Sequence, residues 1–283
     1  MKCSSIYERL IPPNIVDPAY PIPTARPANP GPSTFATQAA GLRGVLPDPA
    51  CVDAPTGAAA LPAGTECYKP GVYQRTLIVG GGGGSPGAYL EPGVYFFDDG
   101  VNIGSGASLW GGLQSGRHGV AIVVPQRNGG GYPGFDGTGA NFLILNRGDA
   151  TCVANTCRAL PALDINGNEV KTSDGLVLTL MVQRDPNCFT GVTPQLCSDN
   201  QNNALKLAGN GTLIVAGVIY APSDRVNINA NFTAQDGVVG QIISWTVDYA
   251  GGATLNQDYP GPDGPGILRL DAACTVPGTP CST

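Results

Sequence analysis

Apolar residues in this chain occur in short runs that alternate with polar or small residues and are separated by glycine-rich turns. The segment 101–110 has this form, and the segment 205–215 repeats it. Alternation with a period of two directs Val101 and Ile103 to one side of a strand and Asn102 to the other. The glycines supply the positive φ angles that sharp corners need. The pattern therefore predicts short β-strands joined at tight corners.

The tetrapeptide Pro-Gly-Val-Tyr occurs twice in the sequence. It begins at Pro70 and again at Pro92, which is 22 residues later (92 − 70). A fixed period of this size, with short apolar runs and no helical spacing, is typical of coils that bury their inward faces by stacking on one another. The repeat predicts a β-solenoid. A period of ~22 residues over roughly 190 residues corresponds to about seven to nine coils.

The composition agrees with an all-β chain. The 283 residues include 41 Gly and 26 Pro, and only 13% are charged. Proline interrupts helices and glycine weakens them, so helix has little support. At 42% apolar residues the chain has enough hydrophobic surface to bury a long core.

Shifts in composition predict three regions. Residues 1–66 are rich in Pro and Ala and are expected to form an extended lead-in. The strand-and-glycine pattern then dominates residues 67–260, the predicted parallel β-helix. Residues 261–283 are rich in Gly and Pro and form a tail or cap. Inside the middle region, 146–170 and 186–203 are expected to be loops between strands.

Net charge and hydropathy argue against a nucleic-acid partner and against a membrane span. The formal net charge is −6, and no basic cluster is interleaved with aromatic residues, so we expect no nucleic-acid partner. No apolar run approaches the roughly 20 residues of a membrane span, and the N-terminus has no signal-peptide pattern. If the protein is exported, we expect the export signal or anchor upstream of Met1.

The nine cysteines fall into four close couples, with Cys3 left over. Couples separated by loop-like sequence are typical of disulfides that pin excursions from a solenoid, which implies an oxidising compartment. Zinc is the alternative, but no couple has two-residue spacing and the single histidine, His118, is distant from all of them. We therefore predict no metal site. The predicted couples are Cys51 with Cys67, Cys152 with Cys157, Cys188 with Cys197, and Cys274 with Cys281.

Catalytic residues are not identifiable from the sequence. Asp98 and Asp99 are adjacent, so in a strand they point to opposite faces, and Asp99-Gly100 is a common turn signal. His118 has no nucleophile nearby in sequence. The glycine run 80–84 leads into another strand and lacks the helix that a phosphate loop must open. We predict no catalytic residue and no cofactor.

Aromatic side chains are the candidates for surface binding. A solenoid displays flat outer faces, and glycan or host-surface binding favours exposed rings. The candidates for such binding are Tyr132, Phe135 and Trp110, and Tyr259 belongs to the same group. The alternative is that these rings pack in the core or against loops.

Five phrases follow one another in order along the chain: 90–103, 119–124, 178–185, 217–222 and 240–243. Their succession resembles the C-terminal half of tight-adherence pilus-associated (TadG-like) bacterial surface proteins, over roughly residues 45–260. The resemblance, with the general rule for parallel crossovers, implies a right-handed parallel β-helix. The chain departs from the family in lacking an N-terminal hydrophobic anchor and in its insertions at 126–140 and 146–170.

The resemblance implies an exported protein with a β-rich part at the cell surface. We therefore expect a non-catalytic extracellular surface or pilus-associated structural or adhesive module. Its expected partners are cell-surface glycans or components of the pilus and envelope. The alternative is a carbohydrate-active β-helix enzyme, a polysaccharide lyase or glycoside hydrolase, whose acidic residues would converge only in three dimensions.

Overall fold

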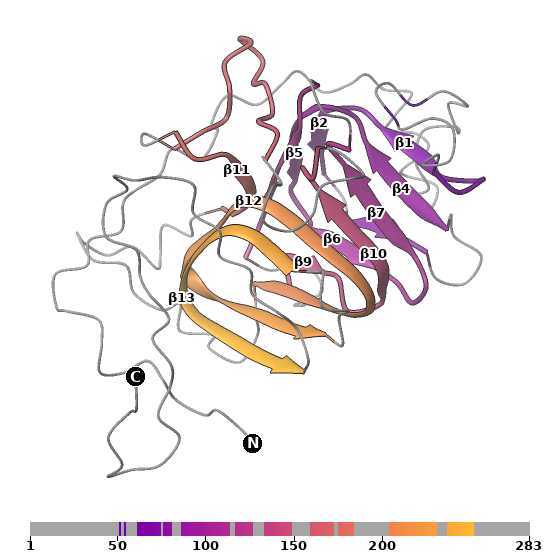
Figure 1. Ribbon diagram of the computed structural model, residues 1–283, viewed down its shortest axis with the longest axis vertical. Coiled ribbons are helices and arrows are strands. Elements are labelled where there is room, and N and C mark those ends of the chain that lie inside the picture. The colour runs from indigo at the N-terminus through magenta and orange to yellow at the C-terminus, as the bar shows by residue number, and fades with distance from the viewer. Residues whose placement is uncertain are drawn as a thin grey trace, which may run out of the picture.

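The computed structural model describes Cys51, Ala54 and residues 61–74, 76–80, 86–113, 117–126, 133–148, 159–172, 175–183, 204–230 and 237–251. This part of the chain is all-β and contains no helix, as the composition predicts. Thirteen strands form one sheet, and every pair of neighbouring strands in it is parallel. The sheet curls around on itself (Figure 1).

The strands form three parallel ladders, because each strand pairs with the third strand after it. The first ladder contains β1 (Glu66–Tyr68), β4 (Gly87–Leu90), β7 (Ser108–Gly111) and β10 (Ala140–Leu145). The second ladder contains β2 (Gly71–Tyr73), β5 (Gly93–Phe97), β8 (Val120–Val124) and β11 (Leu178–Val182). The third ladder contains β3 (Leu77–Val79), β6 (Val101–Ile103) and β9 (Phe135–Asp136).

Two long strands, β12 (Leu205–Ala230) and β13 (Gly237–Gly251), join the three ladders (Figure 1). In chain order, β12 pairs with β9, then β10, then β11, and along most of its length with β13. The amide of Ala204 also donates to the carbonyl of Arg225 at 3.1 Å, so the later part of β12 lies beside the residue that precedes it. One continuous strand therefore pairs with strands of all three ladders.

The spacing between paired strands is not constant, and this corrects the fixed period expected from the sequence. Glu66 pairs with Ala88, 22 residues later (88 − 66), but Leu109 pairs with Leu143, 34 residues later (143 − 109). Segments between the strands lengthen the later circuits. In the described part, the first ladder continued by β12 and β13 has six strands, fewer than the seven to nine coils expected.

The core lies inside the curl of the sheet. Alternation along each strand sends one set of apolar side chains inward, where they form a single cluster that draws on all three ladders. Tyr95, Leu109, Ile122 and Phe135 are among its fully buried members. Burying a side chain of this size stabilises the fold by about 1.5–3 kcal/mol, so this cluster is the main source of stability.

The lead-in is tied to the first strand by a disulfide. Cys51 and Cys67, one of the four predicted couples, are bonded with their Cα atoms 5.5 Å apart. The other three couples and Cys3 lie outside the described residues, as do residues 1–50 and 252–283. Among the residues that the structure describes, no helix has the length and hydropathy of a membrane span.

Candidate functional site

The three ladders differ in what lies on their outward sides. The outward side of the second ladder is apolar and covered. Its residues, including Phe96, Val123, Met181 and Tyr220, form a second hydrophobic cluster with residues of a segment between β10 and β11. That segment, residues 159–172 and 175–177, is called the excursion below. Its Ala162 and Val170 pack against this outer face, so most of the described residues of the cluster are buried.

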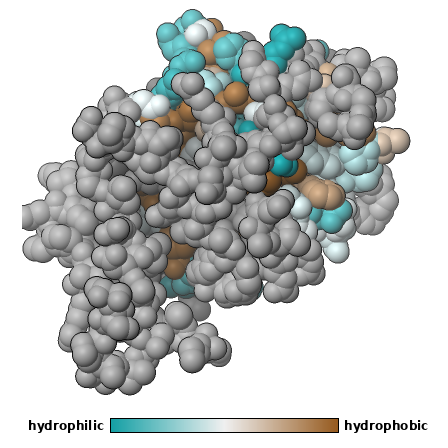
Figure 2. All heavy atoms as spheres, viewed as in Figure 1, coloured by the Kyte–Doolittle hydropathy of each residue, from teal (hydrophilic) through white to brown (hydrophobic). Residues whose placement is uncertain are grey.

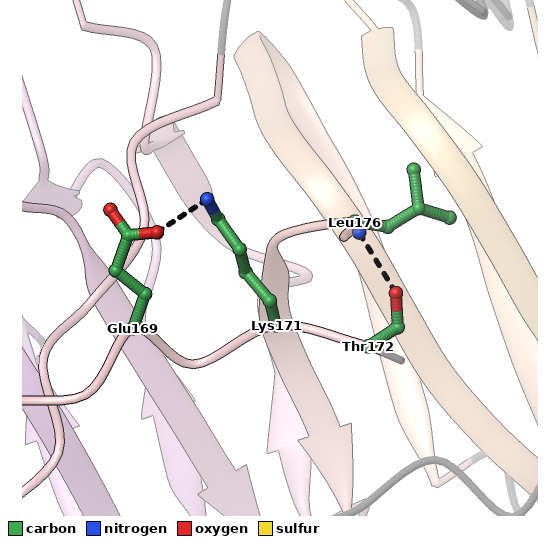
Figure 3. Close-up of polar contacts among 4 residues, drawn as sticks. All are labelled: Glu169, Lys171, Thr172 and Leu176. Atoms are coloured by element: carbon green, nitrogen blue, oxygen red, sulfur yellow. Dashed lines mark hydrogen bonds and ion pairs between the residues drawn. The ribbon is translucent and has the colours of Figure 1, made fainter. Parts of the chain in front are cut away.

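The excursion is held by local polar contacts (Figure 3). Lys171 pairs with Glu169, and the Thr172 hydroxyl accepts a hydrogen bond from the Leu176 amide at 2.8 Å. The Lys171–Glu169 ion pair lies at the surface, where solvent screening leaves such pairs worth about 0–1 kcal/mol. Figure 2 shows hydrophilic residues at the tip of the excursion, although Ile165 in the same turn is 54% exposed. The excursion is thus a cover whose outer surface is mainly polar, with Ile165 exposed among the polar residues.

Asp164 shapes the turn at the tip of the excursion. Its Oδ1 accepts hydrogen bonds from the backbone amides of Asn168 and Asn166, both at 2.8 Å. These bonds to the charged form, that of Asn168 first, hold the pKa of the Asp164 carboxyl below its ordinary value. The carboxylate is therefore occupied in forming the turn, a role that is common for aspartate.

The outward side of the first ladder is aromatic. Tyr89 and Trp110 are partners in the parallel register, and the Trp110 ring stacks on Phe142 with ring centroids 6.4 Å apart. Trp110 is only 5% exposed, so the expectation that it offers an open ring for surface binding is wrong. Phe142, which the sequence reasoning missed, is 37% exposed and is the accessible ring of this group.

The other predicted surface aromatics do not supply an open ring either. Phe135 lies in β9 and points into the core, where it is fully buried, so its assignment to a binding surface is also wrong. Its position in the strand explains the outcome, because Asp136 takes the outward position that follows. Tyr132 and Tyr259 lie outside the described residues.

The outward side of the third ladder is partly exposed and, apart from Ile78, polar, and it is the candidate site. Ile78, Asn102, Asp136 and Lys206 follow one another in the parallel register of β3, β6, β9 and β12. Ile78 is 46% exposed, and the other three are partly exposed. We call Asn102, Asp136 and Lys206 the polar column. Neighbouring strands lie about 4.8 Å apart, so the column presents an amide, a carboxylate and an ammonium group at regular spacing.

Local bonds fix the middle of the column. Asp136 Oδ1 accepts hydrogen bonds from the Thr138 amide at 3.0 Å and from the Thr138 hydroxyl. Such Asx geometry orients a carboxylate without long side-chain contacts. Asp136 therefore stands in a defined position between Asn102 and Lys206.

Further along the same side, β12 and β13 carry a second polar group. Asn227 pairs in register with Asp248, and Arg225 Nε lies 3.4 Å from Asp248 Oδ2. Within the described part of the chain, Asn227 Oδ1 is buried and makes no hydrogen bond. A buried amide oxygen of this kind is costly, and a ligand donor or water would satisfy it.

Asp98 and Asp99, the adjacent carboxylates considered for the enzyme alternative, lie in a turn. The Thr76 hydroxyl lies 2.8 Å from Asp99 Oδ2 and 2.9 Å from the Asp99 carbonyl oxygen, and the Asp98 amide donates to Tyr73 O at 2.8 Å. Gly100 closes the turn with a φ of 85°. The turn interpretation of this pair is thus confirmed. No group of three or more His, Cys, Asp or Glu residues among the described positions could hold a metal ion.

A buried asparagine between the first and second ladders was missed in the sequence. Asn146 is fully buried, has a φ of 57°, and its Nδ2 donates to Val120 O at 2.7 Å and to Thr179 Oγ1 at 2.9 Å. Its Oδ1 accepts from the Val120 amide at 2.7 Å, and Thr179 donates to Ala216 O at 2.5 Å. The network links β8, β11 and β12. Both the oxygen and the nitrogen of the Asn146 side chain bond to protein groups, so we assign the network a structural role. The sequence offered one signal for this position: asparagine tolerates a positive φ better than most residues, so Asn146 directly after a strand could indicate a sharp change of backbone direction.

Comparison with protein-family models, with curated proteins and with solved structures finds no match for this chain.

Proposed function

We propose that the curled parallel sheet is a right-handed parallel β-helix. Three ladders in which each strand pairs with the third strand after it are what a three-sided coil requires, and β12 visits all three sides in one pass. The right hand follows from the general rule for crossovers between parallel strands. A tracing that gave left-handed connections would refute this part of the proposal.

We further propose that the protein is a non-catalytic extracellular module with a structural and adhesive role, at a cell surface or in association with a pilus. The observation that carries this function is the polar column of Asn102, Asp136 and Lys206. A rigid core holds its strands at fixed spacing, and amide and carboxylate groups make paired hydrogen bonds with sugar hydroxyls. We therefore propose a cell-surface glycan as the ligand.

An exported location fits the disulfide between Cys51 and Cys67, because such bonds persist in oxidising compartments. The TadG-like resemblance adds the expectation of a bacterial cell surface or pilus. These points support the proposed location.

The test is a glycan array on the oxidised protein, combined with a polysaccharide depolymerisation screen with and without calcium. We expect binding without release of new sugar ends. Lys206→Ala together with Asn102→Ala should abolish the signal, and Lys171→Ala, which removes a lysine from the excursion, should leave it unchanged. Release of unsaturated or reducing ends would overturn the adhesive role in favour of the enzyme. Silence in both assays would leave a structural role only and refute glycan binding.

A further inference from the structure

The tip of the excursion is a turn, residues 164–168, that backbone hydrogen bonds close. The Asp164 amide donates to Asn168 O at 2.8 Å, and the Gly167 amide donates to Asp164 O at 3.0 Å. The side chains at positions 165–169 are all exposed. The turn is therefore a defined structure that stands in solvent.

This turn contains the dipeptide Asn166-Gly167. When glycine follows asparagine, its backbone nitrogen can reach the side-chain carbon Cγ of the asparagine, because glycine has no Cβ to obstruct the approach. Gly167 has a φ of 81°, and apart from its chain neighbours no atom lies within 4 Å of the place where a Cβ would stand. Neither the local backbone nor a packed neighbour shields this pair.

We propose that Asn166 is a site of spontaneous deamidation. The Gly167 nitrogen loses its proton to solvent and forms a bond to Asn166 Cγ, while the bond from Cγ to Nδ2 breaks and the side-chain nitrogen takes up a proton and leaves as ammonia. Water then adds to either carbonyl of the resulting succinimide ring and opens it, which leaves aspartate or isoaspartate at position 166. The overall change consumes one water and releases one ammonia, with no oxidation or reduction.

The reaction requires only a local opening of the turn. The bond from the Gly167 amide to Asp164 O has to break before the nitrogen can attack. An exposed turn opens at a much smaller free-energy cost than the whole fold. The attack therefore takes place in the folded protein.

Two other asparagines lack one of these conditions each. Asn168 is exposed in the same turn, but the residue after it is Glu169, whose side chain obstructs the attack. Asn210 precedes a glycine but lies inside β12, where a Cβ at Gly211 would collide with the Asn141 carbonyl oxygen. The paired sheet has to open before a ring can form there, so both asparagines should react more slowly than Asn166.

Deamidation changes the bonding of the turn. Hydrogen bonds from Asn168 and from Asn166, including one from the Asn166 side chain, hold the pKa of the Asp164 carboxyl below its ordinary value. The reaction replaces that side-chain donor by a second carboxylate, and like charges at this distance repel. Isoaspartate also inserts one carbon into the backbone. We expect the turn to loosen and the exposed tip to gain a negative charge.

Mass spectrometry of the full oxidised chain tests the proposal directly. The protein is incubated at mildly alkaline pH in water labelled with heavy oxygen and digested with trypsin in ordinary water, so that only deamidation during the incubation carries the label. Peptide 159–171 contains Asn166 and Asn168 as its only asparagines, and peptide 207–225 contains only Asn210. We expect labelling at Asn166 to be about ten-fold faster than at the other two, since glycine leaves the attack unobstructed. Equal rates at the three positions would overturn the proposal.

A matched pair of glycine variants separates the chemistry from backbone strain. Gly167→Ala should slow the labelling of Asn166 about ten-fold, because the methyl group obstructs the attacking nitrogen. Gly175→Ala is the control, since Gly175 lies in the same excursion with a φ of 87° and open space around it but follows an aspartate. It should leave the rate at Asn166 unchanged. An unchanged rate in Gly167→Ala would refute the mechanism.

Hydrogen exchange measures the effect on the turn. Asn166→Asp reproduces one product, and Asn166→Ser removes the amide without adding a charge. We expect the Asn168 amide, which donates to Asp164 Oδ1 at 2.8 Å, to exchange several-fold faster in Asn166→Asp than in Asn166→Ser. Equal exchange in the two variants would show that the new charge does not loosen the turn. None of these results depends on glycan binding, which concerns the polar column of the third ladder.

Discussion

Tyr73 and Tyr95 stack in the core with ring centroids 6.2 Å apart, although the identical phrases that carry them are out of register. Tyr73 pairs with Phe97, whose ring is nearer at 5.1 Å, and Gly71 pairs with Tyr95. The two copies are thus displaced by two residues on the second ladder. A displacement of two preserves which face each side chain occupies, so both tyrosines still point inward.

The buried tyrosines predict loss of stability at alkaline pH. Burial raises the pKa of Tyr95 and of Tyr73 well above the ordinary value, because their ionised forms would be desolvated. In the unfolded chain these groups ionise near pH 10. Their contribution is therefore complete below about pH 10 and is lost as the pH rises above it.

Denaturant unfolding at a series of pH values above neutrality, with phenolate absorbance as a second signal, checks this prediction. Two tyrosines should ionise only when the protein unfolds. A Tyr95→Phe variant should lose about 1–3 kcal/mol at neutral pH, because it removes a hydroxyl within 2.6 Å of Tyr68 O and 2.7 Å of Glu91 O. The same variant should show a weaker alkaline decline. Ionisation of every tyrosine in the folded protein near pH 10 would contradict the prediction.

Asn146→Ala should destabilise the fold by about 3 kcal/mol. The substitution removes the Asn146 side chain from the Val120 amide and carbonyl in a buried setting, and the Thr179 hydroxyl keeps only its bond to Ala216 O. It also places an alanine at a φ of 57°. Urea unfolding monitored by circular dichroism measures the effect.

Asn146→Gly separates the two contributions, because glycine accepts the positive φ and lacks only the side-chain bonds. It should be less damaging than Asn146→Ala by about 1 kcal/mol. Asn102→Ala, a change on the open side of the third ladder, should stay within about 0.5 kcal/mol of the parent. Equal stability of Asn146→Ala and the parent would show that the network is not needed.

Two turn glycines predict a graded effect of adding a methyl group. Gly106 has a φ of 76° and open space where the methyl group of an alanine would stand, so Gly106→Ala should cost only the backbone strain of about 1–2 kcal/mol. Gly100 has a φ of 85°, and a methyl group there would collide with the carbonyl oxygen of Gly134. Gly100→Ala should therefore cost clearly more. Thermal or urea unfolding of the two variants measures the difference, and identical losses would contradict the close approach at Gly100.

Removal of the Cys51–Cys67 disulfide should lower the free energy of unfolding by about 3 kcal/mol. The bond closes a loop with a sequence separation of 16, and loops of this size restrict the unfolded chain by roughly that amount. The double variant Cys51→Ser/Cys67→Ser avoids a free thiol. Unfolding of this variant under oxidising conditions, against the parent, measures the loss. A difference in the free energy of unfolding below about 0.5 kcal/mol would indicate that the disulfide contributes little to stability.

The amino-acid pattern by itself predicted the short strands, the facing of some of them and the first disulfide. Alternation placed Val101 and Ile103 inward and Asn102 outward, and the Asp99-Gly100 signal identified the turn between β5 and β6, because these features depend on neighbours in sequence. The pairing of Cys51 with Cys67, which we predicted from their close spacing, is confirmed.

Only the tertiary structure decided the register, the outer surfaces and the long-range polar network. A fixed 22-residue period failed because segments of different length separate the strands. Trp110 is buried despite its outward position, and Asn146 bonds to groups 26 and 33 residues away. In each case the outcome depends on which distant segments pack together, and the free energy of that packing is not contained in any local pattern.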